Sequence, residues 1–256
     1  MSLRGLTGKV AIVAGGATGI GAATAERLAA EGCSVMIGDI QLEAAEQTAE
    51  KIRADGGVAK AVWFDLADPD SIVALTEATV AGFGGVDLLF NVGSDMSLLA
   101  GDTDVLDIDL ALWDRTMTVT PRGYLLTMRS VIPHMLARGG GSIVNMSSAA
   151  AFQGDPVRPA YSSAKAAVGA LTRHVAGRWG RDGIRCNAVA PGLVATPAIR
   201  SAPQFAGLEA GALKHMRGDR VGDPEDIAAM VAFLMSDEGS WVNGQVLNID
   251  GGTILR

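Results

Sequence analysis

Residues 10–21 read Val-Ala-Ile-Val-Ala-Gly-Gly-Ala-Thr-Gly-Ile-Gly, an apolar run that leads straight into a glycine-rich stretch. The run Val10–Ala14 is apolar throughout, as expected of a strand covered on both faces. The glycines allow a tight turn and let the backbone approach a pyrophosphate at the N-terminus of the helix that follows. Because they stand at this strand-to-helix junction, we favour an anion-binding loop over a plain turn.

Short apolar runs alternate with longer amphipathic stretches along the rest of the chain. The sequence predicts strands at Val10–Ala14, Ser34–Gly38, Ala61–Phe64, Leu88–Phe90, Ser142–Met146, Arg185–Val189 and Val246–Ile249. It predicts helices at Ile20–Glu31, Leu42–Ala54, Pro69–Ala81, Leu110–Ala137, Ala160–Gly180 and Pro224–Ser236. Strands that alternate with helices indicate right-handed crossovers, and hence a parallel sheet with helices on both faces. We find no linker, so residues 1–256 are expected to form one α/β domain.

One long region shows no regular pattern. It runs from Pro197 to Asp223, and Asp223-Pro224-Glu225 then starts the next helix with a capping acceptor and a proline at the first helical position. A structureless stretch of this length in a compact domain is either functional or disordered. We interpret residues 197–223 as a lid over a substrate site.

Composition excludes several classes of protein. The 256 residues are 48% apolar and carry a net charge of −7, so a sizeable core is expected and a broad nucleic-acid-binding face is not. The longest apolar stretches fall short of a membrane span, and the N-terminus lacks a signal-peptide core, so a cytoplasmic location is expected. The two cysteines and three histidines show no ligand spacing, and no metal site is expected.

Asp39 ends the second predicted strand, 18 residues after Gly21. A carboxylate at this place can accept hydrogen bonds from both hydroxyls of an adenosine ribose, and it repels a 2′-phosphate. No lysine or arginine follows directly, since the next residues are Ile40 and Gln41. We therefore expect NAD rather than NADP; the alternative is that Asp39 only caps the next helix.

Tyr161 and Lys165 are four residues apart in a predicted helix and share one face. An ammonium beside a phenol favours the phenolate and lowers the pKa of the phenol, so that it can exchange a proton with a substrate oxygen. Ser148 lies just after the strand Ser142–Met146, at the sheet edge where ligands bind. Its hydroxyl can hydrogen-bond a carbonyl oxygen, or it can simply cap the next segment.

Taken together, these motifs resemble the short-chain dehydrogenase/reductase family over nearly the whole chain. The resemblance implies a Rossmann-like domain with a seven-stranded parallel sheet, and hydride transfer between NAD and a secondary alcohol or ketone. It also implies a catalytic group of Ser148, Tyr161 and Lys165. The cofactor-binding residues that it implies are Gly15, Thr18, Gly19, Ile20, Gly21, Asp39, Ile40, Asp65, Leu66, Asn91, Gly93, Tyr161, Lys165, Pro191, Val194 and Thr196.

Two positions depart from the family pattern. The fourth-strand motif, Asn-Asn-Ala-Gly in the family, reads Asn91-Val92-Gly93-Ser94 here. The family's fourth catalytic residue is an asparagine in the long central helix, and that position holds Thr120, followed by Pro121. Because proline lacks an N–H, we expect Pro121 to bend the helix and to leave the Met117 carbonyl free for a water. Thr120 is therefore a candidate substitute in the proton relay.

We expect a largely apolar substrate. The predicted pocket residues are Met96, Leu98, Ser148, Phe152, Tyr161, Gly192 and Phe205. The alternative is that the lid residues merely pack the lid onto the domain.

Two other functions stay open. One is a carrier-linked 3-ketoacyl reductase, for which Arg129 and Arg173 could form a docking patch; the other is a non-catalytic NAD-binding sensor or structural subunit, which Thr120 would favour. The family resemblance also implies a homotetramer or homodimer built on the helices predicted at 110–137 and 160–180.

Overall fold

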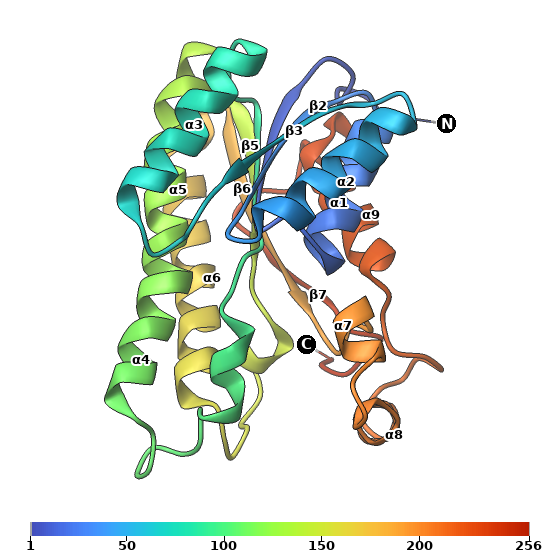
Figure 1. Ribbon diagram of the computed structural model, residues 1–256. Coiled ribbons are helices and arrows are strands. Elements are labelled where there is room, and N and C mark those ends of the chain that lie inside the picture. Colours follow the sequence, from blue (N-terminus) through green and yellow to red (C-terminus); the bar gives the residue numbers. More distant parts are fainter. Residues whose placement is uncertain (1, 256) are drawn as a thin grey trace.

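The computed structural model describes residues 2–255 and shows a three-layer α/β sandwich (Figure 1). Its sheet has seven parallel strands in the order β3-β2-β1-β4-β5-β6-β7. The strands are β1 (Val10–Ala14), β2 (Ser34–Asp39), β3 (Val58–Trp63), β4 (Leu88–Asn91), β5 (Gly141–Met146), β6 (Ile184–Pro191) and β7 (Val246–Ile249). The doubly wound parallel sheet predicted from the alternating pattern is confirmed.

Helices cover both faces of the sheet. The face with α1, α2 and α9 lies opposite the face with α3, α5 and α6 (Figure 1). Their bounds are α1 (Gly19–Ala30), α2 (Leu42–Ala54), α3 (Pro69–Phe83), α4 (Leu110–Met117), α5 (Gly123–Ala137), α6 (Pro159–Trp179), α7 (Pro197–Arg200), α8 (Phe205–Leu213) and α9 (Pro224–Met235). Among residues 2–255, no helix is long and apolar enough to cross a membrane.

Local chemistry fixes several helix starts. The Asp68 carboxylate accepts a hydrogen bond from the Asp70 N–H, with Pro69 at the first position of α3. At α9 the Asp226 carboxylate reaches back to the Asp223 N–H, and Pro224 again opens the helix. These contacts satisfy donors that a helix leaves unpaired at its N-terminus.

Two sequence predictions about regular elements were wrong. The third strand begins at Val58 rather than Ala61, because its partner β2 pairs with it from Ser34 onward. The region predicted to be structureless from Pro197 to Asp223 contains α7 and α8. The Thr196 hydroxyl accepts from the Ile199 N–H, and Pro197 occupies the first turn, so a short helix forms there.

The predicted continuous helix from Leu110 to Ala137 is interrupted. Residues Thr118–Arg122 form a π-helical turn between α4 and α5, and Pro121 lies inside it. Proline cannot donate to the carbonyl four residues earlier, so the chain widens locally and the Gly123 N–H donates to the Thr118 carbonyl, five residues back. The break that Pro121 was expected to cause is confirmed, in the form of this turn.

The strand order reverses at β1, which pairs with β2 on one side and β4 on the other. In an open parallel sheet, ligands bind outside the carboxyl ends of the strands at such a reversal. The glycine-rich loop follows β1, and Asn91–Ser94 follows β4. Both motifs singled out in the sequence therefore lie at the same edge.

Candidate active site

The loop after β1 has a shape that only glycine permits at two positions. Gly15 has a φ of +104°, and a Cβ there would lie 2.4 Å from the backbone nitrogen of Gly93. A Cβ on Gly21 would lie 2.0 Å from the Gly15 carbonyl oxygen. The loop therefore packs backbone against backbone and leaves the N-terminus of α1 uncovered by side chains of its own. This cradle fits the pyrophosphate of a dinucleotide.

Asp39, at the carboxyl end of β2, is half-buried beside this loop. One carboxylate oxygen accepts from the Ala17 N–H at 3.0 Å, and the other accepts from the Gln41 N–H at 3.0 Å. The capping function considered from the sequence is thus present. The same two bonds hold the carboxylate at the rim of the glycine loop, where the next side chain, Ile40, is 55% exposed.

Two residues that the family resemblance assigned to the cofactor also make contacts within the protein. The Asn91 side chain is fully buried: its amide donates to Asn145 Oδ1 at 2.9 Å, and its oxygen accepts from Thr127. Leu66 is buried against Gly93 and Gly123. The side chains of Asn91 and Leu66 therefore help to fix the sheet edge, and their binding of a cofactor stays a prediction.

The segment after β6 lies against the glycine loop. Val194 is buried and forms a β-bridge with Gly222, which closes the lid segment onto the domain. The Thr196 side chain lies beside Gly19, where a Cβ would come within 3.1 Å of Thr196 Cγ2. The predicted cofactor residues Pro191, Val194 and Thr196 thus reach the same edge as the loop after β1.

Ser148, Tyr161 and Lys165 are brought together at this edge. Tyr161 and Lys165 lie on α6, with Lys165 Nζ 5.6 Å from the centre of the Tyr161 ring. The Ser148 hydroxyl is close enough to Tyr161 to lower the pKa of the phenol, and it accepts from the Ala150 N–H at 3.2 Å. Both sequence interpretations of Ser148, substrate-oxygen ligand and local cap, are therefore compatible with its position.

The pKa of Tyr161 is raised above the usual tyrosine value, which contradicts the expected direction. Burial raises this pKa, while the hydrogen bond from Ser148 and the charge of Arg158 lower it. Lys165 is not among the groups that shift this pKa, and its Nζ donates to Ser94 Oγ at 2.8 Å and to the Met146 carbonyl at 3.0 Å. Burial in turn lowers the pKa of Lys165 to about 7.

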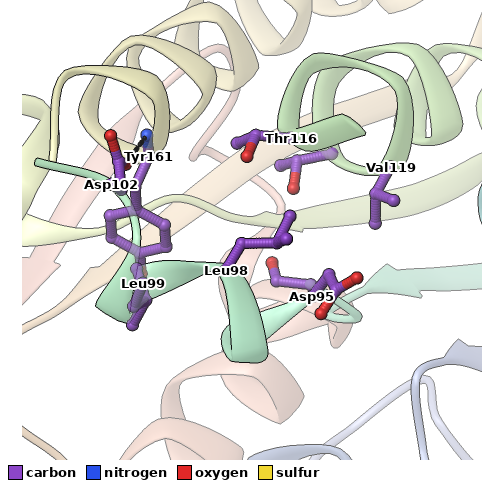
Figure 2. A pocket seen from close by; sticks show the side chains of 9 residues that line it. Asp95, Leu98, Leu99, Asp102, Thr116, Val119 and Tyr161 are labelled. Atoms are coloured by element: carbon purple, nitrogen blue, oxygen red, sulfur yellow. Dashed lines mark hydrogen bonds between the residues drawn. The ribbon is translucent and has the colours of Figure 1, made fainter. Parts of the chain in front are cut away.

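A small cavity lies beside Tyr161, under the segment that follows β4 (Figure 2). It offers about 10 Å³ to the centre of a water molecule. Its walls are Ser94, Asp95, Leu98, Leu99, Asp102, Thr116, Val119, Thr120 and Tyr161. Thr120 is 3% exposed and reaches this cavity from the π-helical turn.

The predicted substrate residues lie in different surroundings. Leu98 and Tyr161 line the small cavity, whereas Met96 and Phe152 are exposed. Phe205 packs against a small cluster formed by Ala195, Met216 and Val221, which holds the lid segment down. For Phe205 and Met216, the packing alternative is therefore observed.

Sequence reasoning missed three residues of the site. Asp102 is 3% exposed and accepts from the N–H groups of Ala160 and Tyr161, at 3.2 and 2.8 Å. Ser94 and the fully buried Tyr124 lie next to the Lys165 ammonium. Ser94 lies in the altered fourth-strand motif, and this departure from the family pattern could have marked it as a site residue. Nothing in the local sequence pattern marked Asp102. Within residues 2–255, no three His, Cys, Asp or Glu side chains gather in a way that could hold a metal ion.

Comparison with known proteins agrees with the site. Residues 14–253 match the family model described as enoyl-(acyl carrier protein) reductase. A probable short-chain type dehydrogenase/reductase of Bradyrhizobium diazoefficiens is 45% identical, over 97% of this chain and 88% of the relative. The cis-4-hydroxycyclohexanecarboxylate dehydrogenase of Sinomonas cyclohexanicum is 38% identical, over 95% and 96%.

A solved structure has the same fold throughout. It is a 7α-hydroxysteroid dehydrogenase in complex with NADH and 7-oxo glycochenodeoxycholic acid, and it is 33% identical with a TM-score of 0.91. The alignment covers 100% of this chain and 97% of that one. The family match, the relatives and this structure agree on the family. The chain therefore belongs to the short-chain dehydrogenase/reductase family and is an oxidoreductase.

Proposed function

We propose that this protein catalyses reversible hydride transfer between NAD and a largely apolar secondary alcohol or its ketone. One observation carries the proposal: Ser148, Tyr161 and Lys165 meet at the sheet edge that also bears the glycine cradle and Asp39. When bound, the nicotinamide ring supplies the hydride acceptor. The relatives named above that act on cyclic alcohols and a steroid support the substrate class.

The chain's own residues account for the proton. During oxidation the substrate alcohol loses a hydride from carbon and a proton from oxygen, and the Tyr161 oxygen takes that proton. The Ser148 hydroxyl hydrogen-bonds the same substrate oxygen and stabilises charge on it. Lys165 places a positive charge 5.6 Å from the Tyr161 ring, which favours the phenolate form once the ammonium is turned toward the phenol.

A substrate panel tests this function. We expect nicotinamide absorbance to change with NAD plus cyclohexanol, cis-4-hydroxycyclohexanecarboxylate or a 7α-hydroxysteroid, and to stay flat with sorbitol. Polyols need a pocket with many satisfied hydrogen bonds, and exposed side chains on the segments that follow β4 and β5, such as Met96 and Phe152, are apolar. Faster turnover of sorbitol than of the cyclic alcohols would refute the apolar substrate.

Preferential turnover of a carrier-bound 3-ketoacyl group with NADPH would instead establish the carrier-linked reductase, and binding of NAD without any turnover would establish the sensor.

Asp39 should determine the choice of cofactor. We expect the unmodified protein to bind NAD more tightly than NADP, and Asp39→Ala to lose most of that preference. The substitution removes both the ribose hydrogen bonds and the charge that repels a 2′-phosphate. Titration calorimetry with each cofactor measures the two affinities. Because the Asp39 carboxylate also holds the Ala17 and Gln41 N–H groups, Asp39→Asn serves as the control that keeps an acceptor for one of them. Equal affinity for NAD and NADP in the unmodified protein would contradict the assignment.

The homotetramer or homodimer stays a prediction. On the stretch where the family resemblance placed the interface, Leu110 is 73% exposed, and Leu125 and Leu136 are also exposed. These side chains are apolar area that a second copy could cover.

A further inference from the structure

The Lys165 ammonium is held by uncharged groups. Its side chain is 1% exposed, and its two acceptors are the Ser94 hydroxyl and the Met146 carbonyl. A buried ammonium is costly unless its donors find partners, and burial is the cause that lowers the pKa of Lys165. Each of the two acceptors therefore contributes substantially to keeping Lys165 protonated. Met146 contributes a backbone atom, so Ser94 is the one side chain among these two acceptors.

Ser94 is itself anchored from the opposite side. On that side stands the fully buried Tyr124 of α5. The Tyr124 hydroxyl donates in turn to the Gly93 carbonyl at 3.0 Å. Tyr124 therefore fixes the peptide that leads into Ser94, and Ser94 Oγ in turn accepts from Lys165 Nζ.

The small cavity adjoins the same hydroxyl. Ser94, Asp95 and Thr120 contribute polar side chains to its walls, and Tyr161 closes one side. About 10 Å³ is open to the centre of a water molecule, which is room for one. Figure 2 shows Asp95 and Tyr161 at opposite sides of this space. The cavity thus adjoins both Ser94 and the partly exposed Asp95 carboxylate, with Tyr161 across the space.

We propose that Ser94 is a positioning residue: its hydroxyl, on a peptide anchored by Tyr124, fixes the Lys165 ammonium and connects it to the water-sized cavity. In this chain Ser94 takes the role in the proton relay that the family resemblance led us to expect of position 120. Thr120 lines the cavity, whereas the two hydrogen bonds of the Lys165 ammonium go to Ser94 and to the Met146 carbonyl. The substitution at position 120 and the serine in the fourth-strand motif are therefore two parts of one rearrangement.

The charged and titratable groups near Lys165 are few. Tyr161 lies on the same helix and Tyr124 on α5, each with its ring centre 5.6 Å from Nζ. From the segment after β4, Asp95 and Asp102 line the cavity, where Asp95 pairs with Arg115 and Asp102 caps the start of α6. The strand β5 contributes only the Met146 carbonyl to the ammonium. Loss of the Ser94 hydroxyl should therefore act directly on the titration of Lys165.

Nuclear magnetic resonance of protein labelled with ¹³C at the lysine Cε tests the proposal. The chain has five lysines, so the Lys165 signal is assigned by its loss in Lys165→Met. We expect Ser94→Ala to lower the midpoint of Lys165 titration by about one pH unit, because a bond to the charged form is lost. We expect Ser94→Thr, which keeps the hydroxyl, to restore the midpoint. Thr120→Ala should leave the midpoint where it is.

Ser130→Ala is the matched control for the loss of a partly buried hydroxyl. Ser130 lies on α5 and donates to Thr76 Oγ1 at 2.7 Å, away from the ammonium. A Lys165 midpoint unchanged in folded Ser94→Ala, or shifted as much by Thr120→Ala, would overturn the proposal. If Ser94→Ala fails to fold, Tyr124→Phe gives the second measurement: removal of the anchor should lower the same midpoint, and an unchanged midpoint would again overturn the proposal.

A turnover measurement adds a second readout and rests on the proposed function. With the best alcohol of the panel, we expect Ser94→Ala to lower kcat about tenfold and to leave KM within about twofold, since the ammonium acts on the proton step. The titration needs no substrate. Absence of turnover with every alcohol would therefore refute the proposed function while the titration still decides the role of Ser94.

Discussion

Tyr161→Phe should bind NAD normally and lose turnover by at least about 10²-fold, the usual contribution of a positioned proton donor. The substitution keeps the ring and removes only the hydroxyl that exchanges the substrate proton. Calorimetry measures cofactor binding, and nicotinamide absorbance measures turnover with the best alcohol of the panel. The Tyr161 side chain also forms a wall of the small cavity, and because the ring stays, that packing is expected to survive.

Ser148→Ala is the comparison for this result. It removes the other hydroxyl aimed at the substrate oxygen but leaves the proton acceptor in place, so its loss of kcat should be smaller than that of Tyr161→Phe. Activity of Tyr161→Phe within a few-fold of the parent would remove Tyr161 from the catalytic role. A large loss of NAD affinity in the same variant would show that the hydroxyl serves binding instead.

Lys165→Met should lose turnover and gain stability at neutral and lower pH. The substitution keeps an unbranched side chain in a site that is 1% exposed, and it removes a buried ammonium. Burial lowers the pKa of Lys165 to about 7 in the folded protein, against 10.5 for an ordinary lysine. Between these two values the unfolded chain binds more protons than the folded one, so the stability of the parent rises with pH.

The stability difference between Lys165→Met and the parent should therefore depend on pH. It should be largest below pH 7, on the order of a few kcal/mol, and it should shrink as pH rises toward 10.5. Thermal unfolding of both proteins across this range measures it. Lys60→Met is the control, since the Lys60 ammonium lies over the Phe83 ring at the protein surface, where little stability depends on its charge. A stability difference that is constant with pH would show that Lys165 is not forced toward its neutral form.

The sequence predicted the fold where the apolar periodicity agrees with the positions of turn and helix-capping residues. The apolar runs around Ile12, Val144 and Ala188 lie in central strands because only buried parallel strands need to be apolar on both faces. The third strand was misplaced since it lies at the sheet edge, where Val58 and Trp63 are exposed and the apolar pattern is weak. The lid helices were missed because α7 has four residues and α8 is rich in alanine and glycine, which gives no amphipathic pattern.

The catalytic group was predictable because its three residues lie close together in the sequence. Tyr161 and Lys165 are one helical turn apart, and Ser148 follows a strand, so helix and strand geometry alone brings them near one another. Ser94 and Asp102 were not assigned, because their partners lie 71 and 59 residues away in the chain. Contacts of that kind depend on how a loop packs, and no periodicity encodes this. The two hydrogen bonds of the Lys165 ammonium, to Ser94 and to the Met146 carbonyl, depend on the same packing.

The strand order has a consequence for how the protein acquires its ligand-binding ability. β1 pairs with β2 over a short separation, Val10 with Ser34, but with β4 over a long one, Ala11 with Leu88. The glycine loop needs both: the Gly15 N–H donates to Gly38, and the Ala14 carbonyl accepts from Val92 and Gly93. Closing the longer loop costs more chain entropy and comes later in folding. A nascent chain that ends before β4 can therefore build the first three strands, yet its cradle for a dinucleotide stays open until β4 docks.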